Sequence, residues 1–319
     1  MKIALVTPAA ANSRYGNRNT AVRWAELLRE LGHQVIIQEC WNGRSADLLL
    51  ALHARRSHDS VLRFSERYPE RPLILALTGT DLYRDIREDA NAQESMELAT
   101  RMIVLQDMGL RELTPPLRRK TRVIYQSCEA VPRQPVIRSC FEIVVSGHLR
   151  AEKDPFCGAT ALSHLPARSR IRITQIGGAR DKALAGEARS WIKQEPRYVW
   201  LGELQRPHAL ATLARARAML ISSRMEGGAN VVSEALMARV PVIASRIPGN
   251  VGMLGPDYGG YYPVGNAREL ARLLRRIETD SDFLKTLRQQ CAERRKLLSR
   301  SQERKKLRSL ITECMRNIK

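Results

Sequence analysis

Acidic side chains are scarce in this sequence: 33 aspartates and glutamates stand against 53 lysines and arginines, giving a formal net charge of +20. Aromatic residues are also few, at 5% of the 319 residues, and no nucleic-acid-binding motif is present. Because nucleic-acid binders of this charge usually combine basic patches with such motifs, the composition favours a positive field that attracts small anionic substrates. Nonspecific RNA binding stays open as an alternative.

Cysteine is sparse as well, with six residues scattered along the chain and no CxxC or CxxH spacing. This pattern argues against a disulfide framework or a metal site, and it indicates reduced thiols in a cytoplasmic protein. No apolar run approaches the roughly 20 residues that cross a bilayer. The short apolar start MKIALV is interpreted as a first strand, not as a secretion signal. We expect no cofactor, no metal and no membrane partner, and the oligomeric state stays open.

Short apolar runs alternate with helical periodicities in two successive series. Such alternation is typical of parallel sheets covered by helices on both faces. The sequence therefore predicts an α/β protein with two Rossmann-like domains facing across a cleft, at residues 1–130 and 131–300, with a proline-containing linker at 129–140. The predicted strands are 3–7, 34–38, 48–52, 73–77, 102–105 and 122–125 in the first domain, and 141–146, 171–176, 198–201, 218–221 and 241–244 in the second.

The segment 222–245, SSRMEGGANVVSEALMARVPVIAS, places two carboxylates, Glu226 and Glu234, around a Gly-Gly turn at a predicted helix start. A helix N-terminus offers unpaired N–H groups and its positive dipole end to phosphate, and glycine lets the backbone approach closely. Carboxylates accept hydrogen bonds from sugar hydroxyls. The pattern predicts a site for a sugar diphosphate, and an ordinary strand–helix crossover is the alternative. The predicted donor-binding residues here are Gly227, Gly228, Ala229, Asn230 and Glu234, with Glu226 facing the sugar.

This Glu–seven residues–Glu element before PVIAS resembles the donor-binding element of GT-B glycosyltransferases of the GT4 type. The resemblance implies that a helix at 301–319 crosses back to the first domain, and that an arginine and a lysine after the first strand of the second domain clamp the donor diphosphate. In SGHLRAEKD, Lys153 fits the lysine position, but His148 replaces the arginine and acts either as a phosphate ligand or as a proton donor. Arg150 can supply the missing charge. Turns expected to cradle the nucleotide contain Gly147, Gly177, Gly178, Gly202 and Leu204.

The first domain is expected to bind the acceptor, because its polar loop at 11–19 is rich in hydrogen-bond donors and opens a helix, which suits an anion. Asp81, after the strand at 73–77, is either a base or hydrogen-bond acceptor, or merely a cap for the next helix. The predicted acceptor-binding residues are Gly16, Asn17, Arg18, Asn19, Thr80, Asp81 and Gln126.

Five longer runs resemble the selenosugar synthases of selenoneine biosynthesis, over nearly the whole chain. The resemblance implies that a UDP-sugar, UDP-N-acetylglucosamine or UDP-glucose, reacts with selenophosphate to give a 1-seleno-sugar, UDP and phosphate. Transfer to a hydroxyl or thiol acceptor is the alternative, and a magnesium ion on the diphosphate stays open. The runs are TPAAANSRYGNRNTAVRWAELL, ALTGTDLYRD, VIYQS, VSGHLRAEKDPF and SSRMEGGANVVSEA.

Overall fold

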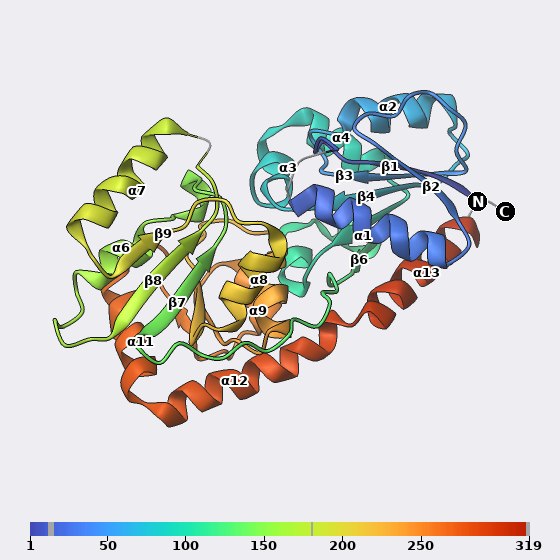
Figure 1. Cartoon of the computed structure of the whole chain (residues 1–319). Coiled ribbons are helices and arrows are strands. Elements are labelled where there is room, and N and C mark those ends of the chain that lie inside the picture. Colours follow the sequence, from blue (N-terminus) through green and yellow to red (C-terminus); the bar gives the residue numbers. More distant parts are fainter. Residues whose placement is uncertain (12–15, 180, 317–319) are drawn as a thin grey trace. The chain divides into compact units, whose positions relative to one another are not determined.

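The computed structural model describes residues 1–11, 16–179 and 181–316, which divide into two compact units (Figure 1). Unit 1 comprises Met1–Ser127 together with the residues from Leu298 on, and unit 2 comprises Cys128–Leu297. Each unit is built around one parallel sheet of six strands. The predicted α/β class is therefore confirmed.

The sheet of unit 1 has the strand order β2-β1-β3-β4-β5-β6. Its strands are β1 (Lys2–Val6), β2 (Gln34–Gln38), β3 (Leu48–Leu52), β4 (Leu73–Leu77), β5 (Arg101–Val104) and β6 (Thr121–Val123). Its helices are α1 (Gly16–Glu30), α2 (His58–Arg67), α3 (Ile86–Glu88), α4 (Ala90–Leu98), α5 (Pro115–Arg119) and α13 (Arg300–Arg316), with a π-helix at Asp81–Asp85 and a 3-10 helix at Asp107–Glu112.

Two apolar cores, one on each face, explain why the central strands of unit 1 are uniformly hydrophobic. Every residue of β3 (LLLAL) and of β4 (LILAL) is buried. On one face these strands pack against α1 and α13, and on the other against α2 and α4. A strand buried on both faces carries a continuous apolar run, because each successive side chain enters one core or the other.

Unit 2 repeats the design with the strand order β12-β11-β10-β7-β8-β9. Its strands are β7 (Phe141–Ser146), β8 (Ile171–Ile176), β9 (Tyr198–Trp200), β10 (Ala218–Ile221), β11 (Val242–Ser245) and β12 (Tyr261–Tyr262). Its helices are α6 (Cys157–Leu162), α7 (Lys182–Gln194), α8 (Arg206–Ala214), α9 (Asn230–Met237), α10 (Pro248–Leu254), α11 (Ala267–Thr279) and α12 (Ser281–Arg295), with a 3-10 helix at Ala151–Lys153. A further 3-10 helix, Lys296–Leu298, crosses the boundary to unit 1.

A buried carboxylate fastens α13 to the rest of unit 1. Glu303 is 1% exposed and accepts hydrogen bonds from the indole N–H of Trp24 at 2.7 Å and from the backbone N–H of Ser127 at 2.9 Å. The guanidinium of Arg23 lies 3.2 Å from the same carboxylate. Glu303 thus connects α13 both to α1 and to Ser127.

The predicted strands are all present, six of them with the same bounds. The first helix differs: Gly16–Asn19 were predicted as loop, but α1 begins at Gly16, and the Thr20 hydroxyl donates to the Gly16 carbonyl at 3.0 Å within that first turn. The sequence also missed β12, a two-residue edge strand. In the described ranges, no helix combines the length and the apolar character needed to cross a membrane.

Candidate active site

A pocket in unit 2 opens at the carboxyl ends of β7, β8 and β10, with about 290 Å³ of empty volume that includes open solvent. Ligands of open α/β sheets bind at this edge, where the strands deliver their loops. The lining residues are Val145, Ser146, Gly147, Lys153, Pro155, Gln175, Leu220, Ile221, Ser222, Ser223, Glu226 and Val231. The pocket therefore contains two of the residues predicted to act on the sugar diphosphate, Lys153 and Glu226.

Lys153 and Glu226 form an ion pair inside this pocket. Lys153 ends the 3-10 helix after β7, and Glu226 lies in the loop between β10 and α9, so the pair links neighbouring strand ends. The side chains are 29% and 10% exposed, respectively. An ammonium group has three donors, so Lys153 can keep Glu226 while it also binds a diphosphate oxygen. Chemically, the pair can offer a cation to a leaving group beside a carboxylate for a sugar hydroxyl.

A short chain of hydrogen bonds connects the loop that carries Glu226 to β11 and α10. The Ser223 hydroxyl donates to Glu226 Oε1 at 2.6 Å, and the Ser245 hydroxyl donates to the Ser223 carbonyl at 2.5 Å. The buried Asn250 amide donates to the Ser245 carbonyl at 2.9 Å. Gly249 is required here, because a Cβ at that position would lie 1.9 Å from the Glu226 carbonyl oxygen. Ser223 was not predicted as a site residue, although it lies in the same sequence segment.

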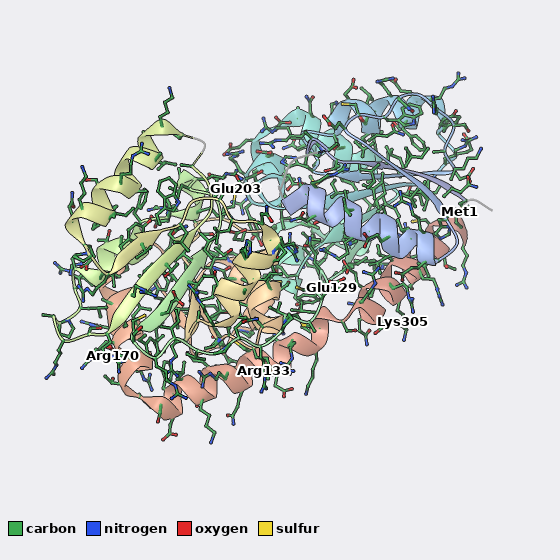
Figure 2. All side chains as sticks on the ribbon, in the orientation of Figure 1. Met1, Glu129, Arg133, Arg170, Glu203 and Lys305 are labelled. Atoms are coloured by element: carbon green, nitrogen blue, oxygen red, sulfur yellow. The ribbon has the colours of Figure 1, made fainter. Side chains whose placement is uncertain are left out.

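Three predicted glycines meet where β7, β8 and β9 end. The Gly147 N–H donates to the Ile176 carbonyl at 2.8 Å, and the Gly177 N–H donates to the Gly202 carbonyl at 2.7 Å. Gly177 has φ +138°, and a Cβ there would lie 2.1 Å from the Gly147 carbonyl oxygen. Only glycine therefore allows these turns to approach so closely. Leu204 lies in the loop after β9, next to Glu203, which is labelled in Figure 2.

His148 and Arg150 lie in the loop between β7 and Lys153. The Nδ1 atom of His148 is buried and has no hydrogen-bond partner in the described part of the chain. Gly178 lies beside it, since a Cβ on Gly178 would be 3.6 Å from that nitrogen. Arg150 forms an ion pair with Glu152, so part of its charge is already neutralised by a neighbour.

The helix α9 begins after Ala229 without a side-chain cap. Its first N–H groups are therefore suited to an anionic ligand, and Val231 of its first turn lines the pocket. Glu234 lies one turn further along, where its Oε1 accepts a hydrogen bond from Arg206 Nη1 at 2.5 Å. Arg206, the first residue of α8, was not predicted from the sequence because the contact joins segments far apart in the chain.

In unit 1, Asp81 is fully buried after β4. Its carboxylate accepts hydrogen bonds from the backbone N–H groups of Gly79 at 2.7 Å, Thr78 at 2.9 Å and Ala54 at 3.1 Å. It thereby holds the loops after β3 and β4 together. This geometry favours a structural carboxylate over a catalytic base.

Next to Asp81, His53 adopts a left-handed backbone with φ +77° and is 3% exposed. Its Nε2 lies 3.1 Å from the hydroxyl of Thr80, a predicted acceptor residue. Burial lowers the pKa of His53, although the nearby Asp81 acts in the opposite direction. The lowered pKa favours the neutral imidazole, which contacts the Thr80 hydroxyl. A strained non-glycine residue often marks a functional position. No sequence motif predicts His53, since this strain is a property of the backbone.

The other predicted acceptor residues lie around the start of α1. Asn17 and Arg18 are half-buried, whereas Gly16 and Asn19 are exposed. Gln126 contacts this helix although it lies 106 positions after Thr20 in the sequence: its amide donates a hydrogen bond to the Thr20 hydroxyl at 3.0 Å. Residues 12–15 of the predicted polar loop lie outside the described residues. Within the ranges that are described, no group of three or more His, Cys, Asp or Glu side chains could hold a metal ion.

Residues 135–297, which include the whole pocket, match the sequence pattern of the family described as glycosyl transferases group 1. That segment covers just over half of the chain.

Several solved structures share the fold over almost the entire chain. Anabaena HepE in complex with UDP-glucose is 15% identical, with a TM-score of 0.79, covering 98% of this chain and 100% of that chain. Sucrose-phosphate synthase from Thermosynechococcus elongatus is 17% identical, with a TM-score of 0.79 and 99% coverage of both chains. An E. coli trehalose-6-phosphate protein bound with UDP-2-fluoro glucose is 10% identical, with a TM-score of 0.73, covering 97% of this chain and 98% of that chain. At these identities the likeness shows the fold, which is the GT-B fold predicted from the sequence.

Proposed function

This chain belongs to the glycosyl transferases of group 1, and from that premise we propose that it transfers a hexosyl group from a UDP-sugar to selenophosphate. UDP-N-acetylglucosamine and UDP-glucose are the proposed donors. The bond from C1 to the diphosphate oxygen breaks, with its electron pair leaving on UDP, and a C1–Se bond forms. Hydrolysis of the Se–P bond then releases phosphate and leaves the 1-seleno-sugar. The reaction is that of a selenosugar synthase.

The Lys153–Glu226 pair is the observation that carries the donor half of the proposal. Lys153 would stabilise the charge that develops on the departing diphosphate, which is among the strongest effects an active site can supply. Glu226 would accept a hydrogen bond from a sugar hydroxyl, held in place by Ser223. Further positive potential would come from the uncapped start of α9, and Glu234 would accept from the ribose hydroxyls.

Solved structures with this fold support a uridine nucleotide as the donor. The Anabaena protein was solved in complex with UDP-glucose and the E. coli protein with UDP-2-fluoro glucose. The proposed donor site occupies the carboxyl edge of the unit 2 sheet, where nucleotides bind in open α/β folds.

The acceptor half of the proposal rests on the chemistry of unit 1. Selenophosphate is a small anion whose selenium is already nucleophilic, so no strong protein base is required. Asp81 fits this requirement, because its oxygens are engaged by backbone N–H groups. Arg18 at the start of α1 would offset the repulsion between two anionic substrates, and the hydroxyl of Thr80, oriented by His53, would bind a phosphate oxygen.

Residence in the cytoplasm is part of the proposal. All six cysteines are free thiols, as expected in a reducing compartment. Burial raises the pKa of Cys157 to about 11, so this thiol stays protonated and unreactive at neutral pH.

The decisive experiment incubates the purified protein with each UDP-sugar and selenophosphate without oxygen, and follows a selenium-containing sugar by mass spectrometry. We expect a 1-seleno-sugar, UDP and phosphate in equal amounts. UDP release with a hydroxyl or thiol acceptor, and none with selenophosphate, would identify an ordinary glycosyltransferase instead.

The same assay tests the acceptor residues. Arg18→Ala should raise the KM for selenophosphate while the KM for the UDP-sugar is unchanged. Arg63→Ala, which removes an exposed arginine of α2 paired with Asp59, is the matched control and should alter neither KM. Equal values for Arg18→Ala and the wild type would place the acceptor elsewhere.

A further inference from the structure

An ion pair joins Arg206 to Glu234, the second carboxylate of the donor segment. Arg206 Nη1 lies 2.5 Å from Glu234 Oε1, and the Arg206 side chain is 59% exposed whereas the Glu234 side chain is 12% exposed. Ion pairs that involve exposed arginines usually contribute little to stability. The pair therefore calls for a role other than holding the fold together.

The two residues lie on helices that follow the ends of β9 and β10, beside the proposed nucleotide site. Arg206 starts α8, directly after the loop that follows β9 and contains Gly202 and Leu204. Glu234 lies on α9, which packs against α8. The ion pair thus connects the loop expected to cradle the nucleotide with the carboxylate proposed for the ribose.

Charge balance gives the pair a second purpose. Two uncompensated carboxylates near a diphosphate would repel it, because like charges at short range interact strongly in a partly desolvated site. Glu226 is already matched by Lys153. Arg206 provides the corresponding cation for Glu234, so each carboxylate of the segment has its own partner from a neighbouring element.

We propose that Arg206 is a positioning residue: it holds the Glu234 carboxylate toward the ribose and thereby sets a preference for ribonucleotides over 2′-deoxyribonucleotides. The inference rests on the proposed donor site. A carboxylate that is already held in one orientation can accept hydrogen bonds from the ribose hydroxyls without a further loss of side-chain entropy. A freely rotating carboxylate loses rotamer freedom when the ribose binds, and this loss weakens binding. Loss of Arg206 should therefore weaken the contribution of the 2′-hydroxyl in particular.

The test measures the Kd of UDP and of 2′-deoxy-UDP by calorimetry. We expect the wild type to bind UDP about tenfold more tightly than the deoxy form, which is the effect of one hydrogen bond to a charged group. Arg206→Met, which keeps the apolar stem, should bring this ratio close to one, as should Glu234→Ala. Arg206→Lys should restore part of the preference. The double variant should show no further loss.

The matched control is Arg276→Met on α11, an arginine that is also 59% exposed and paired with an aspartate. It should keep the wild-type ratio. If Arg206→Met kept that ratio while Glu234→Ala lost it, the role of Arg206 would be refuted and the donor site would stand. If the wild type bound UDP and 2′-deoxy-UDP equally well, or if Glu234→Ala kept the wild-type preference, the proposed ribose site would be wrong, and the inference with it.

Discussion

At the scale of single residues, partial burial strengthens the electrostatic interactions that the candidate site can make with a ligand. Lys153 and Glu226 are exposed enough to meet a ligand, yet sheltered enough that their charges are only partly screened by water. Ser223 adds a hydrogen bond that fixes one oxygen of Glu226. Such prior orientation means that little reorganisation is needed when the substrate binds.

Removing the Lys153 ammonium should slow turnover far more than it weakens binding. Lys153→Ala should lower kcat by about a hundredfold or more, the effect of losing one electrostatic contact to the developing charge, while the Kd of UDP changes much less. Steady-state kinetics and calorimetry give the two values. Lys285→Ala, at an exposed position of α12, is the control. A kcat for Lys153→Ala equal to that of the control would remove Lys153 from the mechanism.

Sequence motifs predicted Lys153, Glu226 and Glu234, because their spacing within short segments is distinctive. They did not predict His53 or Arg206. The first is distinguished by its backbone angle and its contact with Thr80, and the second by a contact across 28 positions of the chain. Neither property leaves a pattern in the local sequence.

At the scale of elements, α13 shows how a distant segment completes a unit. Its apolar side chains, among them Leu307 and Leu310, enter the core beneath α1. Glu303 adds the directional contacts, since donors from Trp24, Ser127 and Arg23 converge on a side chain that is removed from solvent. Apolar packing therefore holds α13 against unit 1, and the contacts of Glu303 fix its position along α1.

Neutralising that carboxylate should destabilise unit 1 substantially. Glu303→Gln leaves the Arg23 charge without its partner and replaces an acceptor oxygen by a donor, at a cost of about 3 kcal/mol. Chemical denaturation followed by tryptophan fluorescence should show an earlier unfolding transition. Glu293→Gln, which removes an exposed pair with Lys296, should leave the transition in place. Similar midpoints for the two variants would contradict the anchoring role.

At the scale of the whole molecule, the net charge of +20 gives the protein a positive field. Exposed basic side chains are spread over both units, including Arg133, Arg170 and Lys305 (Figure 2). A field of this kind raises the rate at which anionic substrates arrive. Both proposed substrates are anions, so the charge fits the proposed reaction without nucleic acid as a partner.

Salt should therefore slow the enzyme under subsaturating conditions. Between ionic strengths of about 0.01 M and about 1 M the Debye length falls from about 30 Å to about 3 Å, and kcat/KM should fall with it. Lys305→Glu combined with Arg133→Glu, both at exposed positions, should reduce the slope while kcat stays unchanged. A kcat/KM that does not depend on salt would show that the field has no part in substrate capture.

The sequence alone determined the α/β class, the two successive sheets and the segment with two glutamates, because hydrophobic periodicity and local motif spacing are properties of neighbouring residues. The bounds of β3, β4 and β10 follow from uninterrupted apolar runs. Only the tertiary structure decided that Asp81 serves the backbone, that Glu303 anchors α13 and that Arg206 partners Glu234. Each of these is a contact between segments far apart in the chain, and such contacts exist only once the sheets and helices have packed.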